Sequence, residues 1–197
     1  MTTRLEFFFD FRSPYSYLAN SQLPALDVEV VYRPFEILGL MDQVGNVPTS
    51  IICKPKSRYL GADLQRWVRM YHVPFQRNPD LATIDARRLL RAVLVAEGLG
   101  KASEAVAAIF RAVWGVPAPL NSAADVAAVL EAVGVGALDL AARIDDPALD
   151  EVLDKATAEA ATRGVFGAPT LLVGDEMFFG NDRFNFVREA LARQEVA

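Results

Sequence analysis

The arrangement of apolar and polar positions divides the chain into three parts, and the first part opens with two strands. Residues 5–9 form a near-continuous apolar run, which indicates a strand buried on both faces. Residues 28–35, VEVVYRPF, are rich in β-branched side chains and predict a second strand. Between these runs, Ser13 and Pro14 form the N-cap and first-turn pattern of a helix, which we expect over residues 14–26.

The middle of the chain has a helical period. Leu64, Trp67, Val68 and Tyr71 share one helix face, and the same spacing recurs over residues 89–113. Alanine is frequent there and favours helix. Residues 36–57 are irregular and predict a long loop, and loops of that length are usually functional or disordered.

The tail returns to strands. Residues 170–173 and 177–179 predict a hairpin turning at Gly174-Asp175, and a helix is expected to begin near Asn181-Asp182, capped by one of them. The predicted fold is therefore α/β, with two β-rich halves (1–56 and 161–197) around an inserted all-helical region (57–160).

Composition narrows the class of protein. The 197 residues are 52% hydrophobic and 23% charged, as in a globular protein with a sizeable core. A net charge of -5 argues against nucleic acid as the main partner. The single cysteine, Cys53, excludes an intrachain disulfide, and with one histidine we expect no metal site. We see no signal peptide and no apolar stretch of membrane-spanning length, so a cytoplasmic protein is expected.

Charge is unevenly distributed. Residues 54–91 hold nine Lys or Arg against three acids, whereas residues 121–160 hold nine acids against two bases. Most of these side chains are interpreted as solvated helix faces. Lys54 and Lys56 are the exceptions, because the pattern places them in the long loop.

Ser13 and Ser16 stand where a strand leads into a helix, an arrangement that resembles the opening of a thioredoxin fold. Such folds often carry Cys-x-x-Cys at this point, but here both ends are serine. A helix start favours an anion, and a hydroxyl there can donate a hydrogen bond. Serine needs an adjacent base to act as a nucleophile. His72 lies in the helical region, so a Ser-His hydrolase is not indicated. Taken alone, Ser13 also fits an ordinary helix cap.

Two further motifs flank the last strands. In GAPT, residues 167–170, a proline precedes a strand, where thioredoxin-like folds place a cis-proline whose preceding residue, Ala168, can pair with a peptide-like ligand. An ordinary loop proline is the alternative. In GNDR, Asn181 and Asp182 are either simple helix caps or donors and acceptors for a ligand's carboxylate and ammonium groups. Asn46 and Lys56 would close the other side of such a site.

Together these segments resemble the 2-hydroxychromene-2-carboxylate isomerases and their relatives, the kappa-class glutathione transferases, within the DsbA-like thioredoxin superfamily. The resemblance runs in order along the chain from residue 6 to about 190 and is carried by DFRSPYSYLAN, GNVP, KPKSRYLGADLQRW, FGAPT and GNDR. It implies a thioredoxin-like domain with an inserted helical lobe.

The resemblance also implies a glutathione-dependent isomerase. Ser13 would be the catalytic residue that faces the glutathione sulfur. The glutathione-binding residues would be Asn46, Lys56, Ala168, Pro169, Asn181 and Asp182. The reaction would interconvert 2-hydroxychromene-2-carboxylate and trans-o-hydroxybenzylidenepyruvate by reversible thiolate addition, a step in naphthalene breakdown. Glutathione and a small aromatic carboxylate are the implied partners, the basic region would hold the carboxylate, and we expect a homodimer.

Three alternatives are weighed against this hypothesis. A kappa-like glutathione transferase shares the site but conjugates glutathione permanently. A DsbA-type oxidoreductase is refuted by the missing cysteines. A non-catalytic binding module conflicts with the matched ligand set. Cys53 is interpreted as incidental, with a reactive thiol as the alternative, and His72 as a surface or packing residue.

Overall fold

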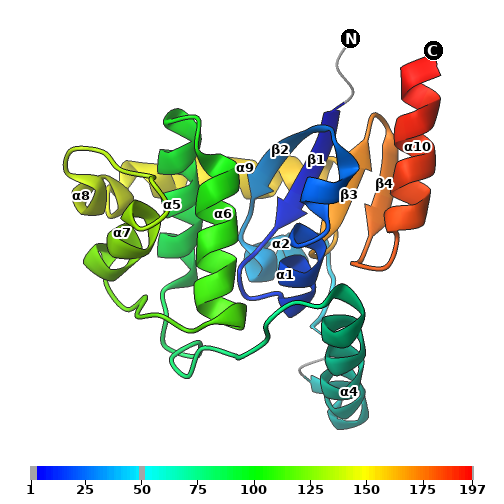
Figure 1. Ribbon diagram of the computed structural model, residues 1–197, viewed down its shortest axis with the longest axis horizontal. Helices are drawn as coiled ribbons and strands as arrows, with labels where there is room; N and C mark the ends of the chain where they lie inside the picture. Colours follow the sequence, from blue (N-terminus) through cyan, green and yellow to red (C-terminus); the bar gives the residue numbers. More distant parts are fainter. Residues whose placement is uncertain (1–3, 49–51, 197) are drawn as a thin grey trace.

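A four-stranded mixed sheet with the strand order β2-β1-β3-β4 lies at the centre of the protein. The structure is a computed structural model that describes residues 4–48 and 52–196 (Figure 1). The strands are β1 (Arg4–Phe9), β2 (Glu29–Pro34), β3 (Thr170–Val173) and β4 (Glu176–Phe179). β1 and β2 are parallel, whereas β3 is antiparallel to both β1 and β4. The predicted β-α-β and β-β-α units are therefore confirmed.

Both faces of the sheet are covered. Successive side chains of β1 point to opposite sides and enter two different hydrophobic clusters. Leu5, Phe7 and Phe9 belong to a large core that includes residues of α1 (Pro14–Asn20), α5 (Ala86–Gly98), α6 (Ala102–Phe110) and α10 (Phe184–Val196). Phe8 packs instead with Leu40 of α2 (Ile37–Gln43) and Ala160 of α9 (Ala148–Thr162). The near-continuous apolar run in β1 reflects this burial on both sides.

Residues 57–160, all of which are described, contain helices and connecting segments and no strand. The remaining elements there are α4 (Lys54–Tyr71), the π-helical turn η2 (Arg111–Gly115), α7 (Ala123–Glu131) and α8 (Leu140–Ile144). The large core continues from β1 into α7 and α8, and α9 packs against both α5 and β2. In Figure 1, α4 projects away from α5–α8. The division into domains at residues 56 and 161 stays a prediction.

Three predicted boundaries were wrong. α1 ends at Asn20, and a separate 3-10 turn spans Leu23–Leu26, because Pro24 has no N–H to donate to the carbonyl oxygen of Asn20 and its ring would clash with that oxygen in a continued α-helix. The predicted loop 36–57 contains α2, whose N-cap is Glu36; its carboxylate accepts the amide of Gly39 at 2.6 Å. α4 already begins at Lys54, because Pro55 is well tolerated in a first turn.

A buried carboxylate organises the junction after β1. Asp10 is fully buried and accepts hydrogen bonds from the backbone amides of Arg12 (2.8 Å) and Ile37 (2.9 Å). The guanidinium of Arg12 pairs with the same carboxylate at 2.8 Å and also with Glu36. The amide of Glu36 donates to Thr157 of α9 at 3.0 Å. This group of contacts joins the starts of α1 and α2 to α9.

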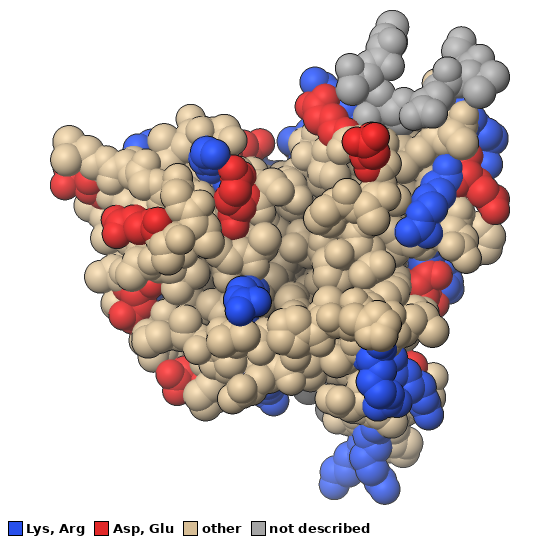
Figure 2. Space-filling model, in the orientation of Figure 1, with Lys and Arg blue, Asp and Glu red and all other residues tan. Residues whose placement is uncertain are grey.

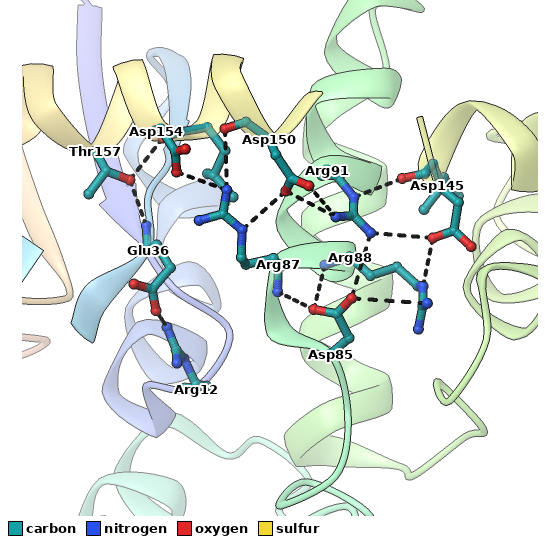
Figure 3. A network of polar contacts seen from close by, with 12 residues as sticks. Arg12, Glu36, Asp85, Arg87, Arg88, Arg91, Asp145, Asp150, Asp154 and Thr157 are labelled. Carbon is teal, nitrogen blue, oxygen red and sulfur yellow. Dashed lines mark hydrogen bonds and ion pairs between the residues drawn. The ribbon is translucent and has the colours of Figure 1, made fainter. Parts of the chain in front are cut away.

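A second polar network joins α5 to α8 and α9 (Figure 3). Its centre is Arg91, a residue that is only 8% exposed. Arg91 donates to Asp150 at 3.0 Å, to Asp145 at 3.3 Å and to the carbonyl oxygen of Ile144 at 3.0 Å. Arg87 donates a further hydrogen bond to Asp150, at 3.1 Å. The buried cation is therefore both charge-paired and hydrogen-bonded, as burial of a charge requires.

Replacing Arg91 should destabilise the fold. Arg91→Met removes the donor of the Ile144 carbonyl oxygen and one donor each from Asp145 and Asp150, which keep Arg88 and Arg87, and we expect a loss of about 1 to 3 kcal/mol in the free energy of unfolding. Arg193→Met is the matched control, because Arg193 pairs with Glu176 on the surface and that pair should contribute at most about 0.5 kcal/mol. Denaturant unfolding of both variants tests the prediction, and equal midpoints for the two would contradict it.

Acid stability should depend on Glu6. A hydrogen bond from Arg163 lowers the pKa of Glu6, burial opposes this, and Arg33 lowers it further. Because the folded pKa lies below the unfolded value, near 4.5, this contribution is complete above that pH and is lost as pH falls through the folded pKa. Glu6→Gln should therefore flatten the loss of stability in acid. Melting temperatures at stepped pH check this, with the exposed Glu29→Gln as control; a curve parallel to wild type would refute it.

Candidate active site at the start of α1

Ser13 is the N-cap of α1, as the sequence predicts. Its backbone is extended (φ -89, ψ 109), and its hydroxyl oxygen accepts the amide of Ser16 at 3.2 Å. The hydroxyl also donates to the carbonyl oxygen of Ala168 at 3.1 Å. Ser13 is 8% exposed. This one side chain therefore connects the helix start to a segment 155 residues further along the chain.

The Ala168-Pro169 peptide bond is cis, which confirms that prediction. Pro169 directly precedes β3, and its carbonyl oxygen accepts the amide of Gly180 at 3.0 Å. The same proline therefore lies between Ser13 on one side and the Asn181-Asp182 segment on the other. The structure brings these three predicted parts of the site together.

Asn181 and Asp182 lie in a turn before α10, and the prediction that one of them caps this helix was wrong. α10 begins at Phe184, where the carbonyl oxygen of Arg183 accepts the amide of Val187 at 3.1 Å. Asn181 is only 4% exposed, and within the described part of the chain its side-chain nitrogen has no hydrogen-bond partner. Asp182 pairs with Arg183. A binding role for Asn181 and Asp182 stays a prediction.

Asn46 lies beside the segment that leads into the cis-proline. Its side-chain nitrogen donates to the carbonyl oxygen of Phe166 at 2.8 Å, and its side-chain oxygen accepts the amide of Val47 at 2.8 Å. The amide group therefore holds the backbone two residues before Ala168. A binding role for Asn46 stays a prediction.

Lys56 lies in the first turn of α4, not in a loop as predicted, because the helix begins two residues earlier. Figure 2 shows basic side chains gathered on the projecting end of the molecule where Figure 1 places α4. This helix carries five cations and one acid, Asp63. The cations are Lys54, Lys56, Arg58, Arg66 and Arg69. A role for Lys56 in binding stays a prediction.

Two tyrosines connect α4 to the site, and the sequence did not single them out for that purpose. The hydroxyl of Tyr15, on α1, donates to Asp63 at 2.8 Å, and the hydroxyl of Tyr71 donates to the carbonyl oxygen of Asn181 at 2.6 Å. Burial, the bond to Asp63 and nearby negative charge raise the pKa of Tyr15, so its hydroxyl stays protonated. The helical period predicted that Trp67 and Tyr71 share one face of the helix, but not what that face contacts. Only Leu64 of that helix is buried.

The other predicted side chains lie away from this chemistry. His72 is exposed and ends α4 in a left-handed conformation (φ 53), in agreement with a surface residue. Cys53 is the partly exposed N-cap of α4. Among residues 4–48 and 52–196, no group of three or more His, Cys, Asp or Glu side chains could hold a metal ion. No helix in the described part of the chain is long and apolar enough to cross a membrane.

The strand order, the cis-proline and the helix start at Ser13 define a thioredoxin-like domain, and the model of the DSBA-like thioredoxin domain matches residues 4–192. A 2-hydroxychromene-2-carboxylate isomerase of Sphingobium xenophagum is 35% identical over 97% of this chain and 99% of its own. A solved structure of such an isomerase superposes with a TM-score of 0.87 at 32% identity, covering 97% of this chain and 95% of that one.

The chain belongs to the 2-hydroxychromene-2-carboxylate isomerase family and is an enzyme of that family, an isomerase. The resemblance inferred from the sequence is thereby confirmed. More distantly, glutathione S-transferase kappa 1 of Caenorhabditis elegans is 27% identical over 98% of this chain and 92% of its own.

Gly180 should be intolerant of a side chain. Its φ of +102 is strained for other residues, and an added Cβ would lie 2.7 Å from a carboxylate oxygen of Asp182. Gly180→Ala should therefore lower the free energy of unfolding by about 1 to 3 kcal/mol. Gly61→Ala, in α4 with nothing within 4 Å, should raise it by about 0.5 to 1 kcal/mol. Thermal unfolding compares the two, and stabilisation by both changes would exclude the strained turn.

Proposed function

We propose that this enzyme uses glutathione to interconvert 2-hydroxychromene-2-carboxylate and trans-o-hydroxybenzylidenepyruvate. The observation that carries the proposal is the position of Ser13. Its hydroxyl stands 3.1 Å from the carbonyl oxygen of Ala168, beside the cis-proline, where a peptide-like ligand can pair with exposed backbone. The named relatives support the same reaction. A homodimeric state and a cytoplasmic location stay predictions.

The residues at this place fit a tripeptide thiol. The Ser13 hydroxyl donates its one hydrogen to the Ala168 carbonyl oxygen, so rotating it toward a thiolate would also release that carbonyl for the ligand backbone. Asp182 would offer a carboxylate for an ammonium group. Asn46 lies beside the same segment through its bond to Phe166. Lys56 and the other cations of α4 would attract the carboxylates of glutathione and of the substrate. The described donors and acceptors therefore match a ligand that carries a thiol, an ammonium group and carboxylates.

In this proposal the protein forms no covalent bond with the substrate. Bound glutathione would supply a thiolate that adds reversibly to the conjugated carbon, so that a double bond becomes single and can rotate. Ser13 would hydrogen-bond that thiolate, which favours the charged form and lowers the pKa of the thiol from its usual ~8.5 by roughly one to two units. With serine at position 16 in place of a second cysteine, no protein thiol at this turn can form a disulfide with the ligand. Ser13 needs no base, because it donates a hydrogen bond and does not attack.

A kappa-like glutathione transferase is the second candidate, because the kappa-class relative matches nearly the whole chain at 27% identity. Such an enzyme would conjugate glutathione permanently to an electrophile. Conjugation of 1-chloro-2,4-dinitrobenzene, measured beside chromene isomerisation, separates the two activities. Conjugation faster than isomerisation would favour the transferase.

Ser13→Ala should keep the fold and much of the glutathione affinity but slow turnover. Losing one hydrogen bond to a charged group costs roughly 1.5 to 3 kcal/mol, or about ten- to a hundredfold in rate. The defect should shrink as pH rises past the free thiol pKa of ~8.5, because the thiolate then forms unaided. Steady-state isomerisation with saturating glutathione, followed from about pH 6 to about pH 9, measures both effects.

Ser21→Ala is the matched control for this experiment. Its hydroxyl donates to the carbonyl oxygen of Leu18 at 2.7 Å, at the opposite end of α1 from Ser13. It should leave the rate and its pH profile unchanged. Activity that does not depend on glutathione, or wild-type activity of Ser13→Ala near neutral pH, would show the mechanism to be wrong.

A further inference from the structure

Tyr71 is the last residue of α4, and its position is fixed from three sides. Its ring lies against that of Trp67, with the centroids 5.3 Å apart. The helix ends directly after it, at His72, whose amide donates to the carbonyl oxygen of Val68. The hydroxyl donates to the carbonyl oxygen of Asn181 at 2.6 Å. Burial raises the pKa of Tyr71, so the hydroxyl remains a donor at neutral pH.

The hydrogen bond from Tyr71 restrains the whole peptide unit to which the Asn181 carbonyl belongs. The Asn181-Asp182 peptide unit is planar, so fixing the direction of the Asn181 carbonyl fixes the Asp182 amide in the opposite direction. It thereby constrains the backbone from which the Asp182 carboxylate projects. On the other side, the turn is held by the bond from the Gly180 amide to the Pro169 carbonyl oxygen. Tyr71 supplies the corresponding restraint from α4.

We propose that Tyr71 is a positioning residue that orients the Asn181-Asp182 turn for the amino-acid end of glutathione. This inference rests on the proposed function, in which Asp182 meets the ammonium group of that end. The contact between Tyr71 and the Asn181 carbonyl gives α4 a part in glutathione recognition, although the Tyr71 hydroxyl itself contacts only protein backbone. Tyr71 therefore acts through Asp182 and sets glutathione affinity.

A different role would give the same contact. α4 is mostly exposed and buries only Leu64, so the Tyr71 bond also attaches the helix to the rest of the protein. Tyr17 provides a matched comparison. Its hydroxyl donates to the carbonyl oxygen of Pro74, also at 2.6 Å, and burial raises its pKa as well. Tyr17→Phe therefore removes an equivalent bond that does not involve the Asn181-Asp182 turn.

Calorimetric titration with glutathione in the absence of substrate tests the proposal directly. Tyr71→Phe should weaken glutathione binding about three- to tenfold, as expected for one lost hydrogen bond, while Tyr17→Phe stays within about twofold of wild type. In an Asp182→Asn background, Tyr71→Phe should have little further effect, because both changes act on the same interaction. Steady-state rates should show a raised KM for glutathione with kcat retained.

Equal weakening by Tyr71→Phe and Tyr17→Phe would overturn the positioning role, and so would an undiminished effect of Tyr71→Phe in the Asp182→Asn background. If Tyr71→Phe binds glutathione as tightly as the wild-type protein does, this inference is overturned and the proposed function stands. Failure of the wild-type protein to bind glutathione at millimolar concentration would overturn both.

Discussion

The buried carboxylate of Asp10 is the constraint on which the site depends. It lies at the end of β1 and is fully buried, so its charge needs several donors. It obtains them from Arg12 and from the amide of Ile37, at the start of α2. In turn, the carbonyl oxygen of Asp10 accepts the amide of Ser13 at 3.0 Å. One residue thus fixes where both helices begin and where the Ser13 hydroxyl stands.

The helical region reaches the same junction from two directions. From α9, Thr157 accepts the amide of Glu36, which pairs with Arg12. From η2, the indole nitrogen of Trp114 donates to the carbonyl oxygen of Phe11 at 2.8 Å. The segment between β1 and α1 is therefore held by the inserted helices as well as by the sheet. In this protein the helical region supports the backbone on which the candidate active site is built.

The strands could be predicted because continuous apolar runs are local signals. The cis-proline and the convergence of Ser13 with the last turns were predicted from the resemblance to thioredoxin-like folds. α2 was missed because its cap is Glu36, a residue type seldom found at that position. The prediction that Asn181 or Asp182 caps α10 was wrong for the opposite reason. Asparagine is a favoured cap, but here Asn181 is buried in a turn before the helix. Helical period alone could not tell that the α4 face of Trp67 and Tyr71 adjoins a site and is not core. For the α4 face the deciding contact is with a residue distant in sequence, whereas α2 was missed for a local reason.

The two serines of the Ser-Pro-Tyr-Ser turn have different surroundings, and this difference bears on why the turn has no sulfur. Ser13 is hydrogen-bonded to the Ser16 amide and to Ala168, at the point where the cis-proline loop meets α1. Ser16 is fully buried, and among the described residues its hydroxyl oxygen has no hydrogen-bond partner. The Ser16 hydroxyl therefore lies in the protein interior. Ser13 is thus the serine that lies at the cis-proline loop, and in the proposed mechanism it would turn its hydroxyl from Ala168 to the thiolate of glutathione. A turn that carries a reactive pair in other thioredoxin-like folds would here supply a single hydrogen-bond donor.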